Sequence, residues 1–324
     1  MSGPRLRVSA PAKINLHLEV LRLRGDGYHE VRTILQSIAL ADTLTVTERP
    51  GPFTVRSRTA SMPRDRGNLV WTAGAALWSA LGRRGEPSGV AVAVRKVVPA
   101  GAGLGGASSD AASALRALAQ LWAPRARARL LREVAAAIGS DVPFFLEGGT
   151  VLAAGRGERL RRLAPAGPYA VVIASPAFGV STPDAYRWWD EDATVRQPPP
   201  KVRRPPGRHF SAGVDAGGPG VDAGASAGLP RGWRSRPDRL WNDLEGPVSD
   251  RHPAIAEMVR RLEASGAIRA GMTGSGSAVI GLYASAAAAE RARRSARLKG
   301  WRTWRNRTTD AAAHARLTAV ARVR

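Results

Sequence analysis

Apolar and polar residues alternate in several stretches of the chain and predict β-strands there. The clearest case is residues 13–20, where Ile14, Leu16, Leu18 and Val20 alternate with polar side chains. A period of two places the apolar set on one face, which predicts a half-buried strand. Similar apolar runs predict further strands over residues 31–40, 43–47, 90–98, 151–154, 169–174 and 278–283.

A second period, with apolar residues three and four positions apart, predicts helices between these strands. In residues 253–264, Ile255, Met258, Val259 and Leu262 share one face, and Gly266 ends the segment. This is the pattern of an amphipathic helix. We also predict helices over residues 68–81, 108–121 and 125–138, a short helix from residue 181 and another from residue 286.

The length and composition indicate a chain large enough for two domains. It has 324 residues, of which 44% are hydrophobic, so sizeable cores can form. It has no cysteine, which excludes disulfides and thiolate metal sites. The first 13 residues lack the apolar core of a signal peptide, and no run of 18 apolar residues occurs. We therefore expect a cytoplasmic protein without a membrane segment.

A formal net charge of +23 raises the possibility of nucleic-acid binding. Residues 195–239 hold nine basic and three acidic residues, and residues 287–324 hold eleven and two, so these two segments together carry +15 of the total. Residues 195–237 are also rich in Pro, Gly and Ala without an apolar period, and we predict that this segment is a disordered insert. We therefore keep nucleic-acid binding through this insert as an alternative function.

The segment from Pro99 to Ala112 is the strongest chemical signal in the chain. Four glycines stand between a predicted strand and a predicted helix, and Ser108 and Ser109 follow at the helix start. Such a loop exposes backbone N–H groups, and the helix directs its positive dipole end at the same place, so the ligand it suits is a phosphate chain. The alternative to a phosphate-binding loop is a simple glycine turn that only joins the strand to the helix.

Two better-known phosphate loops fit this segment less well. The spacing also matches the dinucleotide-binding pattern, but no Asp or Glu occurs between Ala111 and Arg132, where a ribose ligand is expected. The pattern of a Walker A loop is absent because no Gly-Lys-Ser/Thr follows.

Other candidate residues lie outside this loop. Lys13 and Asn15 share one face of a predicted strand, and Tyr28 and His29 follow a Gly-Asp-Gly turn. Asp141 stands at a predicted helix start, where it is either a helix cap or a general base for a hydroxyl. A second glycine loop spans residues 271–277 and either joins two elements or closes on the same ligand as the first.

With these segments in place, the chain resembles the GHMP small-molecule kinases. Within that superfamily it is more similar to the branch that acts on a cytidine diphosphate-linked methylerythritol than to mevalonate or homoserine kinases, because a Gly-Tyr-His turn is expected only in that branch. The resemblance spans about residues 8–285 and is carried by six segments: Ala10–Leu16, Gly27–His29, Pro99–Ala112, Gly139–Phe144, Asn242–Glu245 and Met272–Gly276.

The resemblance implies a two-domain α+β fold and a reaction. The expected domains are a ribosomal-S5-like, ATP-binding domain over residues 1–165 and a ferredoxin-like domain over residues 166–324, with the substrate between them. The implied reaction transfers the γ-phosphate of ATP, accompanied by Mg²⁺, to the 2-hydroxyl of the substrate in the non-mevalonate isoprenoid route. A monomer and a homodimer are both compatible with the sequence, and the insert and the Arg-rich tail are not typical of the family.

The resemblance also implies roles for individual residues. Asp141 would be the base, Lys13 its charged neighbour, and Ser109 a contact of Mg²⁺. Tyr28 and Tyr186 would stack on the two faces of cytosine. The ATP site would comprise Pro99, Ala100, Gly101, Ala102, Gly103, Leu104, Gly105, Gly106, Ala107, Ser108 and Ser109, with Asn68 and Lys96 beside the adenine. The substrate site would comprise Asn15, Tyr28, His29, Thr182, Tyr186, Gly274 and Ser275.

Overall fold

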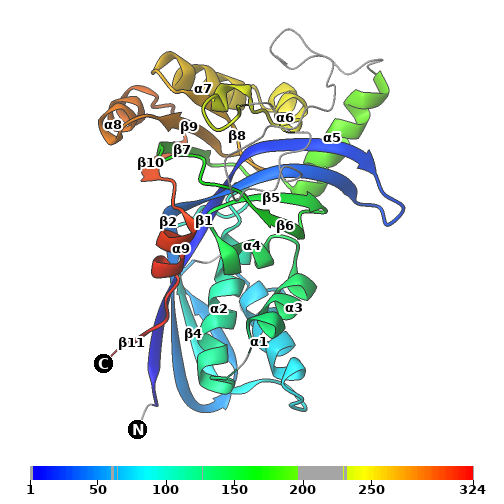
Figure 1. The fold of residues 1–324 in the computed structure, drawn as a ribbon, viewed down its shortest axis with the longest axis vertical. Coiled ribbons are helices and arrows are strands. Elements are labelled where there is room, and N and C mark those ends of the chain that lie inside the picture. Colours follow the sequence, from blue (N-terminus) through cyan, green and yellow to red (C-terminus); the bar gives the residue numbers. More distant parts are fainter. Residues whose placement is uncertain are drawn as a thin grey trace.

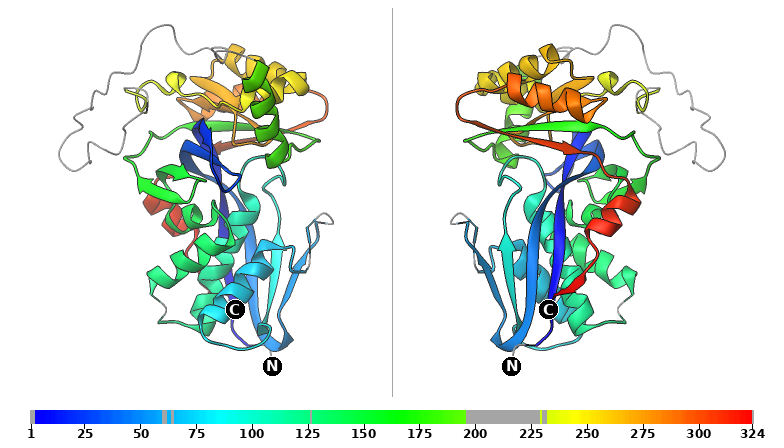
Figure 2. Two further views of the ribbon diagram at one scale, coloured as in Figure 1. Left: turned by 90° about the vertical axis from the view of Figure 1, so that its right-hand side faces the viewer. Right: turned by 90° about the vertical axis from the view of Figure 1, so that its left-hand side faces the viewer.

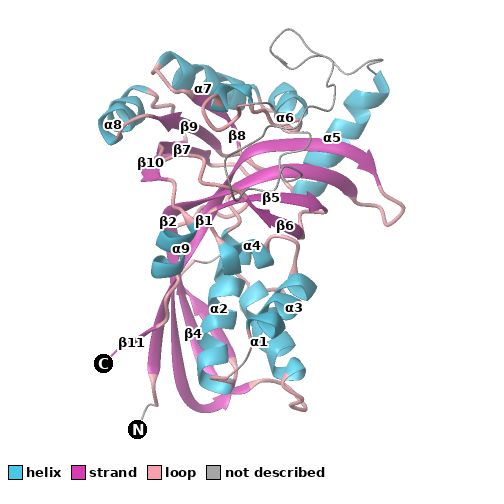
Figure 3. Ribbon diagram, in the orientation of Figure 1, coloured by secondary structure: helices cyan, strands magenta, loops and turns pink. Residues whose placement is uncertain are grey.

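The computed structural model describes residues 3–59, 62–63, 65–125, 127–195, 229 and 232–323. The predicted insert at 195–237 therefore lies largely outside the described residues, and only its two ends fall within them. Two sheets form the framework, and helices pack against each of them (Figures 1 and 3).

The larger sheet has seven strands and is built on two long, adjacent antiparallel strands, β1 and β2. Its main order is β11-β1-β2-β4-β3, and β5 and β6 extend it from the other half of β2. The strands are β1 (Arg5–Leu23), β2 (His29–Pro52), β3 (Thr54–Ser57), β4 (Ser88–Arg95), β5 (Thr150–Gly155), β6 (Arg159–Arg162) and β11 (Ala321–Val323).

Helices cover one face of the main part of this sheet, as both views in Figure 2 show. They are α1 (Leu69–Ala80), α2 (Gly106–Trp122), α3 (Ala128–Ile138) and α4 (Val142–Glu147). Alternation along β1 turns Leu6 and Val8 toward these helices, where they join a core with Leu115 and Leu118 of α2, while Arg5 and Arg7 remain exposed. This half of the sheet is therefore buried on one side only. Residues 10–18 of β1, in contrast, are buried on both faces, so the prediction that the strand over residues 13–20 is half-buried is wrong: Lys13, Asn15 and His17 are buried as well as their apolar neighbours.

The smaller sheet has four antiparallel strands in the order β10-β7-β9-β8. Its strands are β7 (Ala170–Pro176), β8 (Arg269–Met272), β9 (Val279–Tyr283) and β10 (Trp301–Arg307), and the accompanying helices are α5 (Thr182–Val195), the 3₁₀ turn η1 (Pro237–Arg239), α6 (Glu245–Arg251), α7 (Pro253–Ala264) and α8 (Ala286–Ser295). Ile14 and Leu16 of β1 join one core cluster with Ile173 and Ile280 of this sheet, so the long strands link the two parts.

The end of the chain returns to the larger sheet. After β10, helix α9 (Ala311–Leu317) and strand β11 lie against it, and Arg7 of β1 pairs with Ala321. His314 of α9 is fully buried, and its Nε2 lies 2.9 Å from the carbonyl oxygen of Phe145 in α4. The division at residue 165 remains a prediction, and the observed contacts place the last residues of the chain with the first domain.

The buried His314 predicts a pH-dependent contribution to stability. Because its partner is a carbonyl, Nε2 donates the hydrogen bond, and Nδ1 has no partner among the described atoms. Burial lowers the pKa of His314 to about 4. The unfolded chain, with an ordinary pKa near 6.5, then binds more protons below pH 6.5, so the stabilisation declines as pH falls from about 6.5 to 4.

We expect the stability difference between the natural chain and His314→Gln to shrink by about 2 kcal/mol from pH 7.5 to pH 5.0. Urea unfolding of both proteins at both pH values measures this difference. Comparing the two proteins removes the contributions of other titrating groups. An unchanged difference would show that His314 takes up a proton as readily in the folded chain as in the unfolded chain.

Candidate active site

The first glycine loop forms an open helix N-terminus. Gly101, Gly103 and Gly105 all have positive φ angles, and Gly105, with φ of 69°, precedes the first residue of α2. No side chain caps this helix. The first N–H groups of α2 lack helical partners and point out of its N-terminus, which is the arrangement that binds phosphate oxygens.

Lys13 of β1 lies beside this loop. Its Nζ donates hydrogen bonds to the carbonyl oxygen of Gly103 over 2.8 Å and to Oδ1 of Asn15 over 2.6 Å. It also lies 3.8 Å from Oδ2 of Asp141. Burial lowers the pKa of Lys13 from its ordinary value, and the nearby Asp141 carboxylate opposes this change. Lys13 thus connects the loop to the candidate base.

Asp141 precedes α4 but does not act as its cap. It occupies the N-cap position, yet its side chain makes no capping hydrogen bond. The side chain is 34% exposed, and Lys13 is its partner among the described ion pairs. The structure therefore removes the capping alternative and leaves the carboxylate available to a bound group.

The second glycine loop interlocks with the first. A methyl group on Gly276 would lie 2.1 Å from the backbone nitrogen of Gly103, and one on Gly103 would lie 2.2 Å from the carbonyl oxygen of Thr273. Only glycine allows so close an approach. The Asn242 amide supports the second loop by donating to the carbonyl oxygens of Met272 and Gly274.

Helix α5 brings three side chains toward the same region. The hydroxyls of Thr182 and Ser275 are 2.7 Å apart. The ring of Tyr186 stacks on His29 with centroids 4.9 Å apart, and Nε2 of His29 lies 2.9 Å from Oδ1 of Asp190. Burial, with a smaller contribution from the Asp141 carboxylate, raises the pKa of Tyr186.

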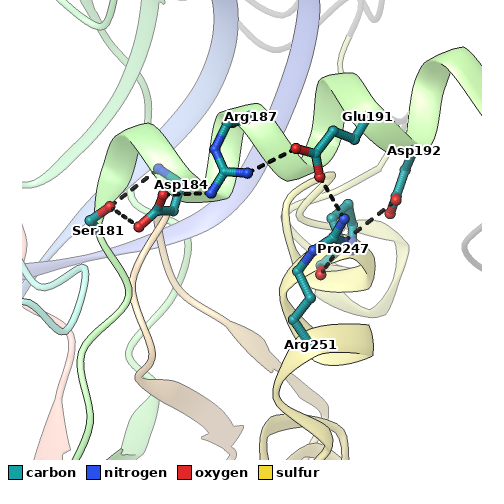
Figure 4. Close-up of polar contacts among 7 residues, drawn as sticks. All are labelled: Ser181, Asp184, Arg187, Glu191, Asp192, Pro247 and Arg251. Carbon is teal, nitrogen blue, oxygen red and sulfur yellow. Dashed lines mark hydrogen bonds and ion pairs between the residues drawn. The ribbon is translucent and has the colours of Figure 1, made fainter.

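Another side of α5 is attached to α6 by charged groups (Figure 4). Arg251 of α6 donates to Glu191 over 2.9 Å and to the carbonyl oxygen of Pro247 over 3.1 Å. Arg187 joins Glu191 to Asp184, and Ser181 donates to Asp184 at the start of the helix. This exposed network holds α5 in place while Thr182 and Tyr186 contact the candidate site.

The remaining predicted residues lie in different surroundings. Tyr28 is 56% exposed, with the Arg156 guanidinium 5.1 Å from its ring centroid. Asn68 caps α1, accepting from the N–H of Val70, and has no described hydrogen bond to the glycine loop. Ser109 is fully buried and its hydroxyl donates to the carbonyl oxygen of Pro11, whereas Ser108 is half-buried at the start of α2.

Lys96 lies in a buried charge cluster behind the loop. Its Nζ is 2.5 Å from Asp42 and 2.7 Å from Asp110, and it would lie 3.3 Å from a methyl group placed on Gly106. Burial lowers the pKa of Lys96, but the two carboxylates outweigh it and leave the pKa raised. Burial raises the pKa of Asp110 to about 7, against the attraction of Lys96. In this arrangement Lys96 fixes the end of β4 to α2.

Three residues at the site were not predicted from the sequence. Asp190 pairs with His29, Thr33 accepts the amide hydrogen bond of Asn15 over 2.7 Å, and the Thr273 hydroxyl accepts from the N–H of Asn15 over 2.8 Å. Asp190 is four residues after Tyr186, so helical spacing places the two on one face. No comparable signal marks Thr33.

Fold and site together define a small-molecule kinase of the GHMP type. Models of the GHMP kinase N-terminal and C-terminal domains match residues 68–149 and 228–300. The 4-diphosphocytidyl-2-C-methyl-D-erythritol kinase of Heliobacterium modesticaldum is 38% identical over 291 residues, which are 88% of each chain, and the one of Bacillus subtilis is 37% identical over 279 residues, 86% of this chain and 88% of that protein. The chain belongs to this kinase family.

Solved structures agree with this assignment. A 4-(cytidine 5'-diphospho)-2C-methyl-D-erythritol kinase superposes with a TM-score of 0.70 and 34% identity, covering 93% of this chain and 98% of that one. Homoserine kinase from Cytophaga hutchinsonii shares the fold, with a TM-score of 0.67 at 18% identity over 99% of this chain and 98% of that one. The predicted two-domain α+β kinase fold is thus confirmed. No helix in the described part of the chain is long and apolar enough to cross a bilayer.

Proposed function

We propose that this protein transfers the γ-phosphate of ATP to the 2-hydroxyl of 4-diphosphocytidyl-2-C-methyl-D-erythritol. The observation that carries the proposal is the position of Lys13, which contacts Gly103 of the phosphate loop and lies 3.8 Å from the Asp141 carboxylate. A phosphate-binding loop, a cation and a carboxylate therefore meet in one place. The names of the relatives supply the identity of the alcohol, and the reaction would be a step of the non-mevalonate isoprenoid route.

The catalytic roles follow from the demands of phosphoryl transfer. The reaction depends on positioning and on neutralising charge more than on covalent help from the protein. The N–H groups at the start of α2 and the loop residues 99–109 would hold the ATP phosphates. Lys13 would neutralise charge near the transferred phosphate, and Asp141 would orient the alcohol and accept its proton as the bond to phosphorus forms.

The cytidine end of the substrate would lie near His29 and α5. Tyr28 and Tyr186 would offer aromatic surfaces to the base. His29 follows Tyr28 in the sequence and is the first residue of β2. His29 stacks on the Tyr186 ring, so the two side chains form one aromatic surface at this end of the site. Asn15, Thr182, Gly274 and Ser275 surround the junction of the two loops and would contact the rest of the substrate.

Mg²⁺ would accompany ATP in this reaction, with a limited contribution from protein ligands. Among the described residues no group of three or more His, Asp or Glu side chains could hold a metal. Magnesium bound with ATP takes most of its ligands from phosphates and water, so such a group is not required. The buried Ser109 hydroxyl, committed to Pro11, does not fit a metal contact, and we assign no step to it.

A substrate panel tests the proposal. ATP consumption is measured with 4-diphosphocytidyl-2-C-methyl-D-erythritol, mevalonate and homoserine at equal concentrations. We expect turnover with the first and at least 100-fold lower kcat/KM with the other two. A preference for mevalonate or homoserine would leave the chain a kinase but overturn the proposed substrate.

Because this substrate and ATP are water-soluble, we expect the reaction to occur in the cytoplasm.

Tyr186 provides a test of the cytidine site. Removing the ring with Tyr186→Ala should raise KM for the cytidine substrate about 5- to 100-fold, because stacking of an aromatic ring on a base contributes about 1–3 kcal/mol. The KM for ATP should stay within twofold of the natural value. Steady-state kinetics with each substrate varied in turn measures both constants.

The matched control is Tyr186→Phe, which keeps the ring and removes the hydroxyl. It should retain a KM within about threefold of the natural protein. If Tyr186→Ala and Tyr186→Phe raise KM equally, the hydroxyl, and not stacking, holds the substrate. If neither changes KM, the base binds elsewhere.

A further inference from the structure

A basic hollow lies on the exposed face of the larger sheet, away from the helices. It encloses about 530 Å³ and is lined by strands β1, β2, β3, β4 and β11. Its lining includes five arginines, Arg5, Arg7, Arg56, Arg58 and Arg95, and no acidic or aromatic residue.

Strand register explains why this face is hollow. Arg7 of β1 pairs with Thr45 of β2, Thr45 pairs with Ala93 of β4, and Ala93 pairs with Arg56 of β3. One row across the sheet thus has long arginines at its ends and small side chains in its middle. Three strand spacings separate the ends by about 14 Å. The side chains of Arg7 and Arg56 are long enough to reach toward one another over the small residues.

The arginines of this hollow have no carboxylate partners in the described part of the chain. Arg5, Arg7, Arg56, Arg58 and Arg95 form no ion pair there, whereas arginines elsewhere do, such as Arg32 with Glu19 and Arg251 with Glu191. Arg95 has a hydrogen bond of 3.5 Å to the Thr43 hydroxyl. Lys96 at the rim is neutralised by Asp42 and Asp110. The hollow therefore presents uncompensated positive charge together with hydroxyl donors.

We propose that this hollow is a second anion site that binds a small molecule with two linked phosphates, a diphosphate. Guanidinium groups bind phosphate oxygens through paired N–H donors, and several of them converging on one place favour a multiply charged anion. The bounded hollow favours a small ligand over a nucleic acid. Single-stranded nucleic acid also needs aromatic side chains for base stacking, and the lining has none.

The hollow and the glycine loop lie on opposite faces of the sheet and have one neighbour in common, Lys96 at the rim, whose Nζ would lie 3.3 Å from a methyl group on Gly106. The hollow opens on the outer face of β1, β2 and β4, whereas α2, whose N-terminus carries the loop, packs against the inner face through residues such as Val92 and Leu115. Figure 2 shows the helices on one side of this sheet. A ligand in the hollow can therefore bind while ATP occupies the loop.

The test is calorimetric titration of inorganic pyrophosphate into the full chain already saturated with a non-hydrolysable ATP analogue. Occupying the loop leaves the hollow as the binding place. We expect one bound pyrophosphate per chain, and at least tenfold weaker binding in the triple variant Arg7→Gln, Arg56→Gln, Arg95→Gln. Titration with ADP under the same conditions distinguishes a nucleoside diphosphate from a bare diphosphate as the preferred ligand.

The matched control removes three other exposed arginines, Arg84, Arg132 and Arg316, each changed to Gln. It has the same net charge as the first variant and should bind pyrophosphate within twofold of the natural chain. The first variant should keep its KM for ATP. Absence of binding with the loop occupied, equal losses in both variants, or a raised KM for ATP would each overturn the proposal. Tight binding of an oligonucleotide but not of pyrophosphate would also overturn it, in favour of a nucleic-acid surface.

Discussion

Asp141→Asn is expected to lower kcat by about 10²- to 10⁴-fold, the usual contribution of a positioned acid or base. The substitution keeps the size of the side chain but removes its charge and its ability to accept a proton. The carboxylate does not cap α4, so the helix loses no hydrogen bond. Its ion pair with Lys13 spans 3.8 Å, and because the Lys13 ammonium is buried, losing the carboxylate should also lower the free energy of unfolding.

Stopped-flow or steady-state assays of ADP release measure this effect, and binding of an ATP analogue should remain within threefold of the natural protein. Glu133→Gln is the control, because Glu133 is an exposed carboxylate on α3 that pairs with Arg129 at the surface. It should retain full activity. A kcat for Asp141→Asn within fivefold of the natural value would remove Asp141 from the catalytic role and leave Lys13 and the loop as the essential groups.

Much of the fold follows from local patterns in the chain. The alternation at residues 13–20 lies within β1, and the predicted helices over 68–81, 108–121, 125–138 and 253–264 match α1, α2, α3 and α7 to within a few residues. Their apolar residues recur with a period of two or 3.6, which is visible in the sequence. The period does not give the burial, because the polar positions Lys13, Asn15 and His17 of β1 are buried as well. The short helix expected from residue 181 is longer than predicted and extends to Val195.

The elements that were not predicted share a physical cause. Strands β3, β6 and β11 have three or four residues, too few for a period to be recognised. β10 is longer, but it is rich in Trp and Arg without a regular apolar alternation, and its Arg content led us to interpret it as part of an Arg-rich tail. β10 and β11 are held by pairing with β7 and β1, which are distant in sequence, and local composition does not encode such pairing.

The residues of the candidate site likewise include some that could be predicted from the sequence and some that could not. The phosphate loop could be predicted from its glycines, because three of the four, Gly101, Gly103 and Gly105, have the positive φ angles that glycine favours. The meeting of Lys13 with Asp141 joins β1 to the start of α4 and was reached only through the resemblance to a family. The pairing of His29 with Asp190 was not predicted, since it depends on how α5 packs against β2.

Gly276→Ala is expected to lower kcat/KM by at least 100-fold and the free energy of unfolding by about 1–3 kcal/mol. The added methyl group would lie 2.1 Å from the nitrogen of Gly103 and 2.2 Å from the carbonyl carbon of Ala102, and both are backbone atoms. The two loops must separate by roughly 1 Å, a misplacement that costs about 10²-fold in rate, and overpacking of this kind costs about 1–3 kcal/mol. Initial-rate kinetics and urea unfolding measure the two effects.

Gly179→Ala is the matched control, because a methyl group there also approaches the first glycine loop but at an ordinary distance of 3.6 Å from the carbonyl oxygen of Gly101. Neither Gly179 nor Gly276 has a positive φ angle, so backbone strain does not distinguish them. Gly179→Ala should therefore keep both activity and stability close to the natural values. Full activity in Gly276→Ala would mean that the loops can part without disturbing phosphate binding, and that their close contact serves only to join the two domains.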